Sequence, residues 1–177
     1  MTITDIFYRV NQFSNALFAG SLSLDENRII QELLTSEQQK LFLRLERSEQ
    51  KHSLRVLRTL IDEGETSRDL LVAALLHDIG KTRSPLNIWE RVLVVLGKAF
   101  FPEYVKRWET NDQDNWRRPF VVAKTHPQWG AEMALEAGAS PLTIALIRRH
   151  QEQLKTNFQE PMEDRLLKKL QEADRKN

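Results

Sequence analysis

Cysteine is absent from the 177-residue sequence. Its absence excludes disulfides, thiol nucleophiles, iron–sulfur clusters and zinc sites with thiolate ligands. Any metal would therefore be held by histidine, aspartate or glutamate. A sequence without cysteine is compatible with the cytoplasm, which is the location we expect.

The sequence also lacks an excess of charge of one sign and a long hydrophobic run. Its 26 basic and 25 acidic residues give a net charge of +1, so we expect no DNA partner. The most apolar stretch, residues 92–101, is interrupted by Lys98 and is far shorter than the ~20 residues that span a bilayer. No signal peptide and no membrane span are expected. A small phosphorylated ligand needs only a few local cations and is not excluded.

Glycine and proline are both scarce, with six of each, and apolar residues follow helical spacing almost throughout. The sequence therefore predicts an all-α fold, a single-domain helical bundle. Residues 111–118 are expected to form a loop, and a capping box is expected at Ser36 and Gln39. Gly64 and Gly80 are expected to end the helices before them. The predicted helices cover residues 2–19, 25–34, 36 to about 47, 52–63, 67–79, about 89–101, 128–136, 141–150 and about 160–174.

His77 and Asp78 form an adjacent pair directly after the seven apolar residues 70–76. A helix this apolar is buried, and a buried histidine and aspartate need a partner or a metal ion to compensate for lost hydration. The alternative interpretation is a helix end at which the aspartate accepts a structural hydrogen bond.

The string HDIGK at residues 77–81, with His52 upstream and Asp174 in a C-terminal helix, resembles the HD phosphohydrolase superfamily and its H…HD…D pattern. His126 and His150 lie where a subset with two-metal sites has further ligands. That subset includes the HD-GYP phosphodiesterases, but Gln151 and Glu152 stand where their GYP signature would follow, which argues against cyclic-di-GMP hydrolysis.

The resemblance implies a metal-dependent phosphoric ester hydrolase acting on a small phosphorylated substrate, such as a nucleotide, through metal-activated water. It also implies one or two divalent transition-metal ions (Fe, Mn, Zn or Ni, with Mg a poorer fit). Residues 49–177 would form the HD-type metal-binding domain, and residues 1–48 a helical extension packed on it. Asp164 is an alternative to Asp174 as the last ligand. The implied metal ligands are His52, His77, Asp78, His126, His150 and Asp174.

Catalysis is assigned to Asp78 as a ligand and to Lys81, which either caps a helix end or binds a substrate phosphate. Four arginines are further candidates for the phosphate, and residues 83–124 are a candidate substrate entrance, with packing as the alternative role. These arginines are Arg117, Arg118, Arg148 and Arg149.

Two other functions compete with hydrolysis. The same ligands would suit a di-iron oxygenase on this fold, which redox-active iron and oxygen consumption would reveal. A non-catalytic ligand-sensing or scaffold module would fail to bind metal or to hydrolyse any phosphoester. The oligomeric state is not predicted.

Overall fold

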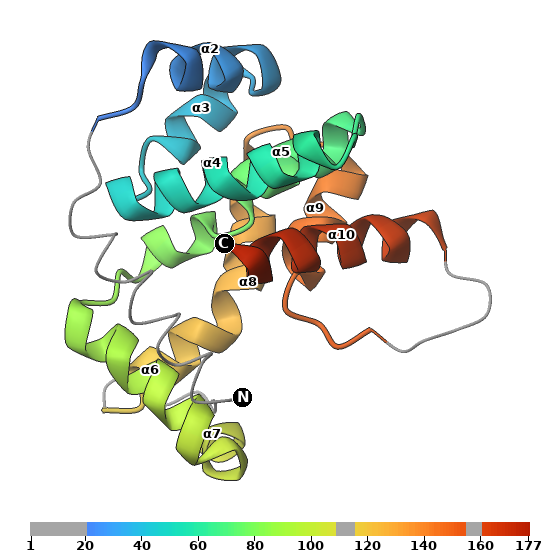
Figure 1. The fold of residues 1–177 in the computed structure, drawn as a ribbon. Helices are drawn as coiled ribbons and strands as arrows, with labels where there is room; N and C mark the ends of the chain where they lie inside the picture. Colours follow the sequence, from blue (N-terminus) through green and yellow to red (C-terminus); the bar gives the residue numbers. More distant parts are fainter. Residues whose placement is uncertain (1–20, 109–115, 155–160) are drawn as a thin grey trace.

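The computed structural model describes residues 21–108, 116–154 and 161–177, and these residues form helices with no strand among them. The all-α prediction is confirmed (Figure 1). The helix predicted over residues 2–19 lies outside the described residues. The described helices are α2 (Leu24–Leu33), α3 (Ser36–Phe42), α4 (Arg47–Asp62), α5 (Arg68–Leu76), the 3-10 helix η1 (Ile79–Arg83), α6 (Ile88–Phe100), α7 (Pro102–Trp108), α8 (Arg118–Glu136), α9 (Pro141–Arg149) and α10 (Met162–Lys176).

The centre of the core is α5, in which every residue from Leu70 to Leu76 is buried. The hydroxyl of Ser67 accepts a hydrogen bond from the Leu70 N–H and caps the helix. Helices α4, α9 and α10 pack around α5, so its apolar surface is removed from water on several sides. Burial of this surface is the main driving force for the fold.

The helix α5 ends at Leu76, four residues before the predicted stop at Gly80. Gly80 has another role, because a Cβ there would lie 1.9 Å from the His126 carbonyl oxygen and 2.6 Å from the Gly130 nitrogen. The backbone of η1 therefore crosses α8 at a distance that no side chain permits. Gly64 does end α4, with a φ of 82° that suits glycine.

The small helices α2 and α3 cover one side of the core. The predicted capping box at Ser36 and Gln39 is wrong by one residue: Thr35 is the cap, and its partner is Gln38. Thr35 has the extended backbone that a cap requires, whereas Ser36 is already helical.

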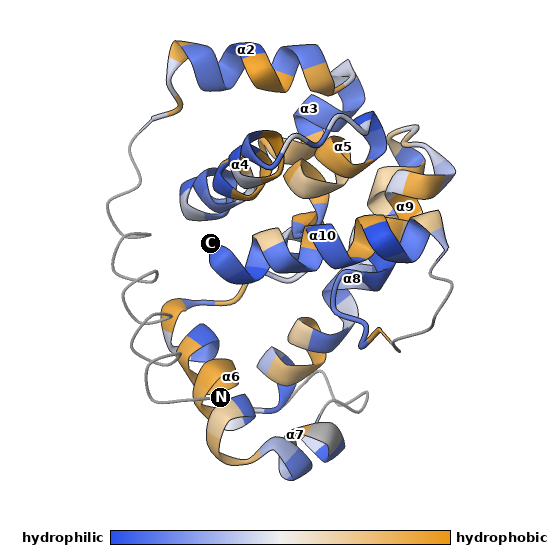
Figure 2. Ribbon diagram, turned by 45° about the vertical axis from the view of Figure 1, so that its right-hand side comes forward, coloured by the Kyte–Doolittle hydropathy of each residue, from blue (hydrophilic) through white to orange (hydrophobic). Residues whose placement is uncertain are grey.

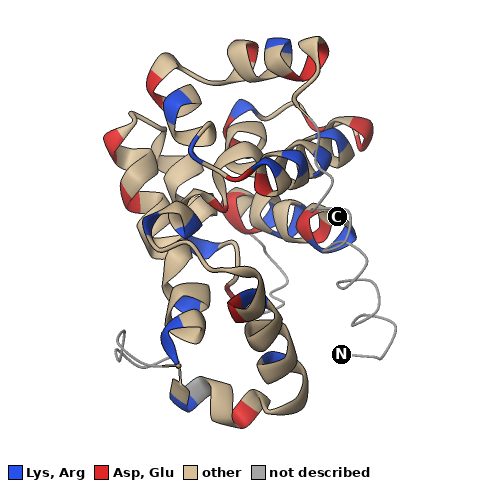
Figure 3. Cartoon of the chain, turned by 90° about the vertical axis from the view of Figure 1, so that its left-hand side faces the viewer, with Lys and Arg blue, Asp and Glu red and all other residues tan. Residues whose placement is uncertain are grey.

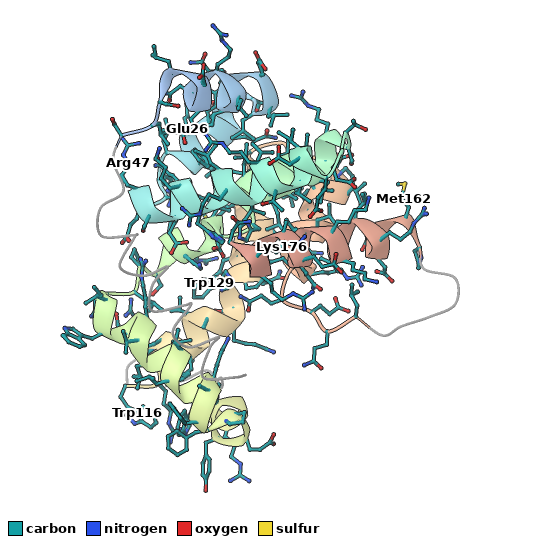
Figure 4. The ribbon with its side chains drawn as sticks, in the orientation of Figure 1. Glu26, Arg47, Trp116, Trp129, Met162 and Lys176 are labelled. Atoms are coloured by element: carbon teal, nitrogen blue, oxygen red, sulfur yellow. The ribbon has the colours of Figure 1, made fainter. Side chains whose placement is uncertain are left out.

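A buried carboxylate fastens α2 to α4. Glu26 closes its own capping box with Ser23 and accepts hydrogen bonds from Lys51 at 2.6 Å and Arg58 at 3.1 Å. Figure 4 labels Glu26 between these two helices. A charged group shielded from water requires such partners.

The helix α8 begins at Arg118, ten residues before the predicted start at residue 128, and it continues through Pro127. The predicted loop over residues 111–118 lies partly outside the described residues, and its last residue is helical. A proline inside a helix leaves the carbonyl four residues earlier without its donor. Here that carbonyl belongs to Ala123, and the Nδ1 of His126 lies 3.1 Å from it, so the helix continues.

The arm formed by α6 and α7 projects away from the other helices and is attached along α8 (Figure 1). The break at Pro102 is confirmed, since α7 begins there. Figure 2 shows that α6 is hydrophobic along most of its length, and Figure 4 labels Trp116 at the far end of the arm.

Acidic and basic residues are interspersed over the other helices (Figure 3). No helix in the described part of the chain is long and apolar enough to cross a membrane.

Candidate metal centre

Five helices bring the six predicted ligands together. His77 is the C-terminal cap of α5, and Asp78 follows it before η1. His150 is the corresponding cap of α9. His52 lies in α4, His126 in α8 and Asp174 in α10. The crossing of η1 and α8 at Gly80 carries Asp78 close to His126, with 3.3 Å between Asp78 Oδ1 and His126 Nε2.

The ligands form two adjacent groups. The first consists of His52, His77 and Asp174, and the second of Asp78, His126 and His150; in each group the possible ligand atoms lie within 4.8 Å of one another. The two oxygens of Asp78 face different groups, since Oδ2 lies 3.4 Å from His77 Nε2 and Oδ1 3.3 Å from His126 Nε2. Such a carboxylate can bridge two metal ions.

Backbone carbonyls orient three of the four imidazoles. The Nδ1 atom lies 2.9 Å from the Ala74 carbonyl oxygen in His77 and 2.7 Å from that of Ile147 in His150. In His126 the Nδ1 faces the carbonyl of Ala123. A ring that donates its Nδ1 proton to a carbonyl has, when neutral, a lone pair at Nε2. This is the arrangement found in metal-binding histidines.

The Nε2 lone pairs point at each other and at carboxylates. His126 Nε2 and His150 Nε2 are 3.3 Å apart, and His150 Nε2 lies 3.8 Å from Asp78 Oδ1. The buried Nε2 of His77 faces the carboxylates of Asp78 and Asp174 at 3.4 and 3.6 Å. Lone pairs of neutral imidazoles that face one another and a carboxylate are unfavourable unless a proton or a metal cation lies between them. The donor set therefore fits a metal.

Electrostatics keep most of these groups in the protonation states that ligands need. Burial favours the neutral acid of Asp78, but Lys81 and the nearby imidazoles hold its pKa well below the ordinary value. Burial has the same effect on Asp174, yet hydrogen bonds to His52 and His77 lower its pKa. Burial and positive charge on neighbouring histidines lower the pKa of His150 to about 3. Both carboxylates stay ionised at neutral pH and His150 stays neutral.

His77 differs from His150. Burial opposes its charged form, but the carboxylates of Asp78 and Asp174 raise its pKa well above the ordinary value. Two carboxylates therefore attract positive charge to this position. A metal ion between His77 and the carboxylates would supply that charge in place of a proton.

The model of the HD domain family matches residues 50–176. The chain belongs to the HD domain family. The comparisons with curated proteins and with solved structures each found no match. The matched region contains all six candidate ligands, and the two groups that could hold metal ions consist of them alone.

The alternative ligand Asp164 lies elsewhere. It forms an ion pair of 2.8 Å with Arg149, whereas Asp174 lies 2.9 Å from His52 Nε2 and 3.6 Å from His77 Nε2. The structure thus brings Asp174, and not Asp164, to the other ligands.

Lys81 lies beside the six candidate ligands and contacts two carboxylates. Its Nζ lies 2.6 Å from Asp78 Oδ2 and 3.2 Å from Glu49 Oε2. Glu49 in turn accepts a hydrogen bond from Arg91 of α6, which also pairs with Glu46 at 2.6 Å. Sequence reasoning missed Glu49, although its position three residues before His52 places both on neighbouring turns of α4.

The four candidate arginines are not gathered at the ligands. Arg149 pairs with Glu152, Glu163 and Asp164. Arg118 bonds to Glu90, Ser84 and Pro85 and so ties the start of α8 to the start of α6. Arg117 lies over the ring of Trp116, and Arg148 is exposed. These contacts favour structural roles for Arg118 and Arg149.

A cavity of about 550 Å³ opens between the end of α9 and α10. Its lining includes the candidate ligands His150 and Asp174 together with Lys168 and Arg175. Neither of these two cations forms an ion pair with another described residue. Sequence reasoning missed both, although Arg175 is adjacent to Asp174. Among the described residues of the predicted entrance (83–108 and 116–124), none lines this cavity.

Proposed function

We propose that the protein is a metal-dependent phosphohydrolase that cleaves a phosphoester with metal-activated water. One observation carries the proposal. The buried Nε2 atoms of His126 and His150 lie 3.3 Å from each other and 3.3–3.8 Å from the ionised carboxylate of Asp78. A metal ion bound there would lower the pKa of bound water and so supply hydroxide near neutral pH.

The ligands favour a particular class of metal. Imidazole nitrogen and carboxylate oxygen suit Mn, Fe, Ni or Zn better than Mg, which prefers oxygen alone. His52, His77 and Asp174 would hold one ion, and His126 and His150 a second, with one oxygen of Asp78 turned toward each. Lys81 holds the Asp78 carboxylate from outside. Backbone carbonyls fix the ring orientations, so the ligands need little rearrangement.

The cavity beside His150 and Asp174 indicates the side from which substrate approaches. Its volume of about 550 Å³ is in the range of small-molecule sites and suits a substrate of mononucleotide size. Lys168 and Arg175 would attract its anionic groups, while Gln151, whose Nε2 lies 3.4 Å from His126 Nε2, borders the ligands.

Metal analysis followed by a phosphoester panel tests the proposal. Purified protein should contain close to two transition-metal ions per chain and release phosphate or cleave a phosphodiester. One ion or fewer under metal-replete conditions would remove His126 and His150 from the ligand set. Oxygen consumption by iron-loaded protein without phosphoester cleavage would favour the oxygenase alternative.

Asp78→Ala is the decisive variant because Asp78 faces both ligand groups. We expect it to lose metal and at least ~100-fold in activity, with helical circular dichroism unchanged. Asp164→Ala is the matched control: it removes a carboxylate that pairs with Arg149 and should leave metal content unchanged. Full activity in Asp78→Ala would overturn the proposed function.

The two cavity cations give a prediction on substrate binding. Replacing Lys168 and Arg175 with Gln should raise KM about 30-fold, since two charge contacts to a phosphate, each on the order of 1 kcal/mol, contribute about 2 kcal/mol. Metal content and kcat should change little. Arg148→Gln is the control, as Arg148 is exposed and does not line the cavity. An unchanged KM in the double variant would place the substrate elsewhere.

A further inference from the structure

An exposed apolar stripe runs along α6. Trp89, Leu93, Leu96 and Phe100 are 78%, 38%, 41% and 62% exposed. They are separated by four, three and four residues, so they lie on one side of the helix. Trp89 and Phe100 are mostly exposed, and Leu93 and Leu96 are exposed by more than a third. A contiguous apolar surface of this kind marks a binding face.

The sequence of residues 2–19 has the same spacing. Ile6, Val10, Phe13 and Leu17 are also separated by four, three and four residues, which predicts one apolar helix side. Alternating steps of three and four residues are typical of paired helices. The outer positions are eleven residues apart in both sets, or about 16 Å of helix. Each stripe therefore matches the other in length and period.

We propose that residues 2–19 form a helix that packs on the α6 stripe of the same chain. The inference is independent of the proposed hydrolase function. The helix runs antiparallel to α6, so that Leu17 meets Trp89 and Ile6 meets Phe100. Phe13 then meets Leu93, and Val10 meets Leu96.

Two ion pairs support the connection within one chain. Glu26, in the first turn of α2, pairs with Lys51 near the start of α4. Arg91, in the first turn of α6, pairs with Glu46 directly before α4. The starts of α2 and α6 are therefore each linked by an ion pair to the N-terminal end of α4, which lies between these two helices in Figure 1.

This placement fixes the direction of the proposed helix. The six residues from 18 to 23 connect Leu17 to the start of α2 and span up to about 20 Å. This connection is most direct when Leu17 lies beside the start of α6. A parallel helix would place Leu17 beside Phe100, farther along α6. The tether also gives the segment an effective concentration in the millimolar range, which favours it over a separate molecule.

Cysteine cross-linking tests the register, because the chain has no cysteine of its own. The test pair is Ile6→Cys with Phe100→Cys in the full-length protein. The matched control is Ile6→Cys with Trp89→Cys, which a parallel helix would join instead. Oxidation at low protein concentration should yield a disulfide-linked monomer from the test pair, several-fold more than from the control pair.

Three outcomes overturn the proposal. Disulfide-linked dimers would show that a second copy covers the stripe. A higher yield from the control pair would reverse the direction, and no cross-link in either pair would leave the stripe to another partner.

A charge substitution in the full-length chain provides a second measurement. Phe13→Asp should at least double the fluorescence of a dye that binds apolar surfaces, whereas Asn15→Asp, on the opposite side of the predicted helix, should not. Equal fluorescence in the two variants would contradict the proposed packing.

Discussion

Single residues at the site have clearly different tasks. Asp78 faces both ligand groups, His126 and His150 present nitrogen lone pairs, and Lys81 holds Asp78 from the solvent side. Glu49 contacts none of the six ligands directly, but it pairs with Lys81 and Arg91. We therefore expect Glu49 to act as a positioning residue, because its ion pair restricts where the Lys81 ammonium can lie.

Glu49→Gln gives the prediction at this scale. Burial opposes the charge of Lys81, but Asp78 and Glu49 together raise its pKa above the ordinary value. The variant should keep its metal and lose about tenfold in kcat, the equivalent of ~1.4 kcal/mol, because Lys81 is less well fixed. Glu46→Gln is the control, since Glu46 pairs with Arg91 and is more exposed. Metal loss in Glu49→Gln would instead indicate a direct role at the ions.

At the level of elements, helix ends and one crossing build the site. The carboxyl ends of α5 and α9 supply His77 and His150, and the carbonyls of their last turns orient the rings. The contact between η1 and α8 sets the position of Asp78 relative to His126. Glycine is required at residue 80 because the two backbones touch there.

Gly80→Ala should push η1 away from α8. Its Cβ would overlap the His126 carbonyl, so η1 has to move, at a cost of about 3 kcal/mol in the free energy of unfolding. Metal at the second ligand group should be lost as well. Gly130→Ala is a milder change at the same crossing, because its Cβ would meet the Ile147 methyl group at 3.2 Å and the Gly80 nitrogen at 3.3 Å, where a shift of a few tenths of an ångström suffices. Denaturant unfolding and metal analysis should show a much larger loss for Gly80→Ala.

Glu26 gives a pH-dependent prediction for the attachment of α2. Burial favours its neutral form, but the hydrogen bond and charge of Lys51, the Ser23 N–H and Arg58 lower its pKa below the ordinary 4.5. Because the pKa of Glu26 is lower in the folded state than in the unfolded state, ionised Glu26 stabilises the protein at pH values above the unfolded-state pKa. This stabilisation is lost as the pH falls through the folded-state pKa.

Glu26→Gln should therefore cost about 2 kcal/mol at pH 7 and much less at pH 3. Urea unfolding at both pH values measures the difference. Glu37→Gln is the control, since Glu37 pairs only with Lys40 on the surface. An equal loss at both pH values would mean that shape, and not charge, fastens α2.

For the whole molecule, the candidate ligands come from five helices that are distant in sequence. Metal binding would join α4, α5, α8, α9 and α10 at one point. It should therefore stabilise the packing of all five helices against unfolding. A ligand that binds only the folded state raises stability by mass action.

Removal of metal by a chelator should lower Tm by roughly 5 °C or more, since about 1 kcal/mol shifts the Tm of a domain this size by ~2–4 °C. Addition of Mn or Zn should restore it. Asp78→Ala should show little change with chelator, because it has already lost metal. An unchanged Tm in the parent protein would indicate that the clusters bind no metal.

The sequence by itself determined the helical class, the chemistry of the candidate ligands and several helix ends. Helical spacing, an apolar run before His77 and residues such as Ser67, Gly64 and Pro141 act through neighbours a few positions away, so they can be recognised locally. The scarcity of histidine, with only four in the chain, made the ligand set small enough to name.

Only the tertiary structure decided which polar groups meet. Asp174 lies among the candidate ligands and Asp164 does not, since nearly three turns of α10 separate them and Asp164 pairs with Arg149 of another helix. Glu49, Lys168 and Arg175 belong to the site through the packing of α4 and α10. Ion pairs and cavities depend on distances between separate helices, and those distances follow from close crossings such as the one at Gly80, which local spacing does not encode.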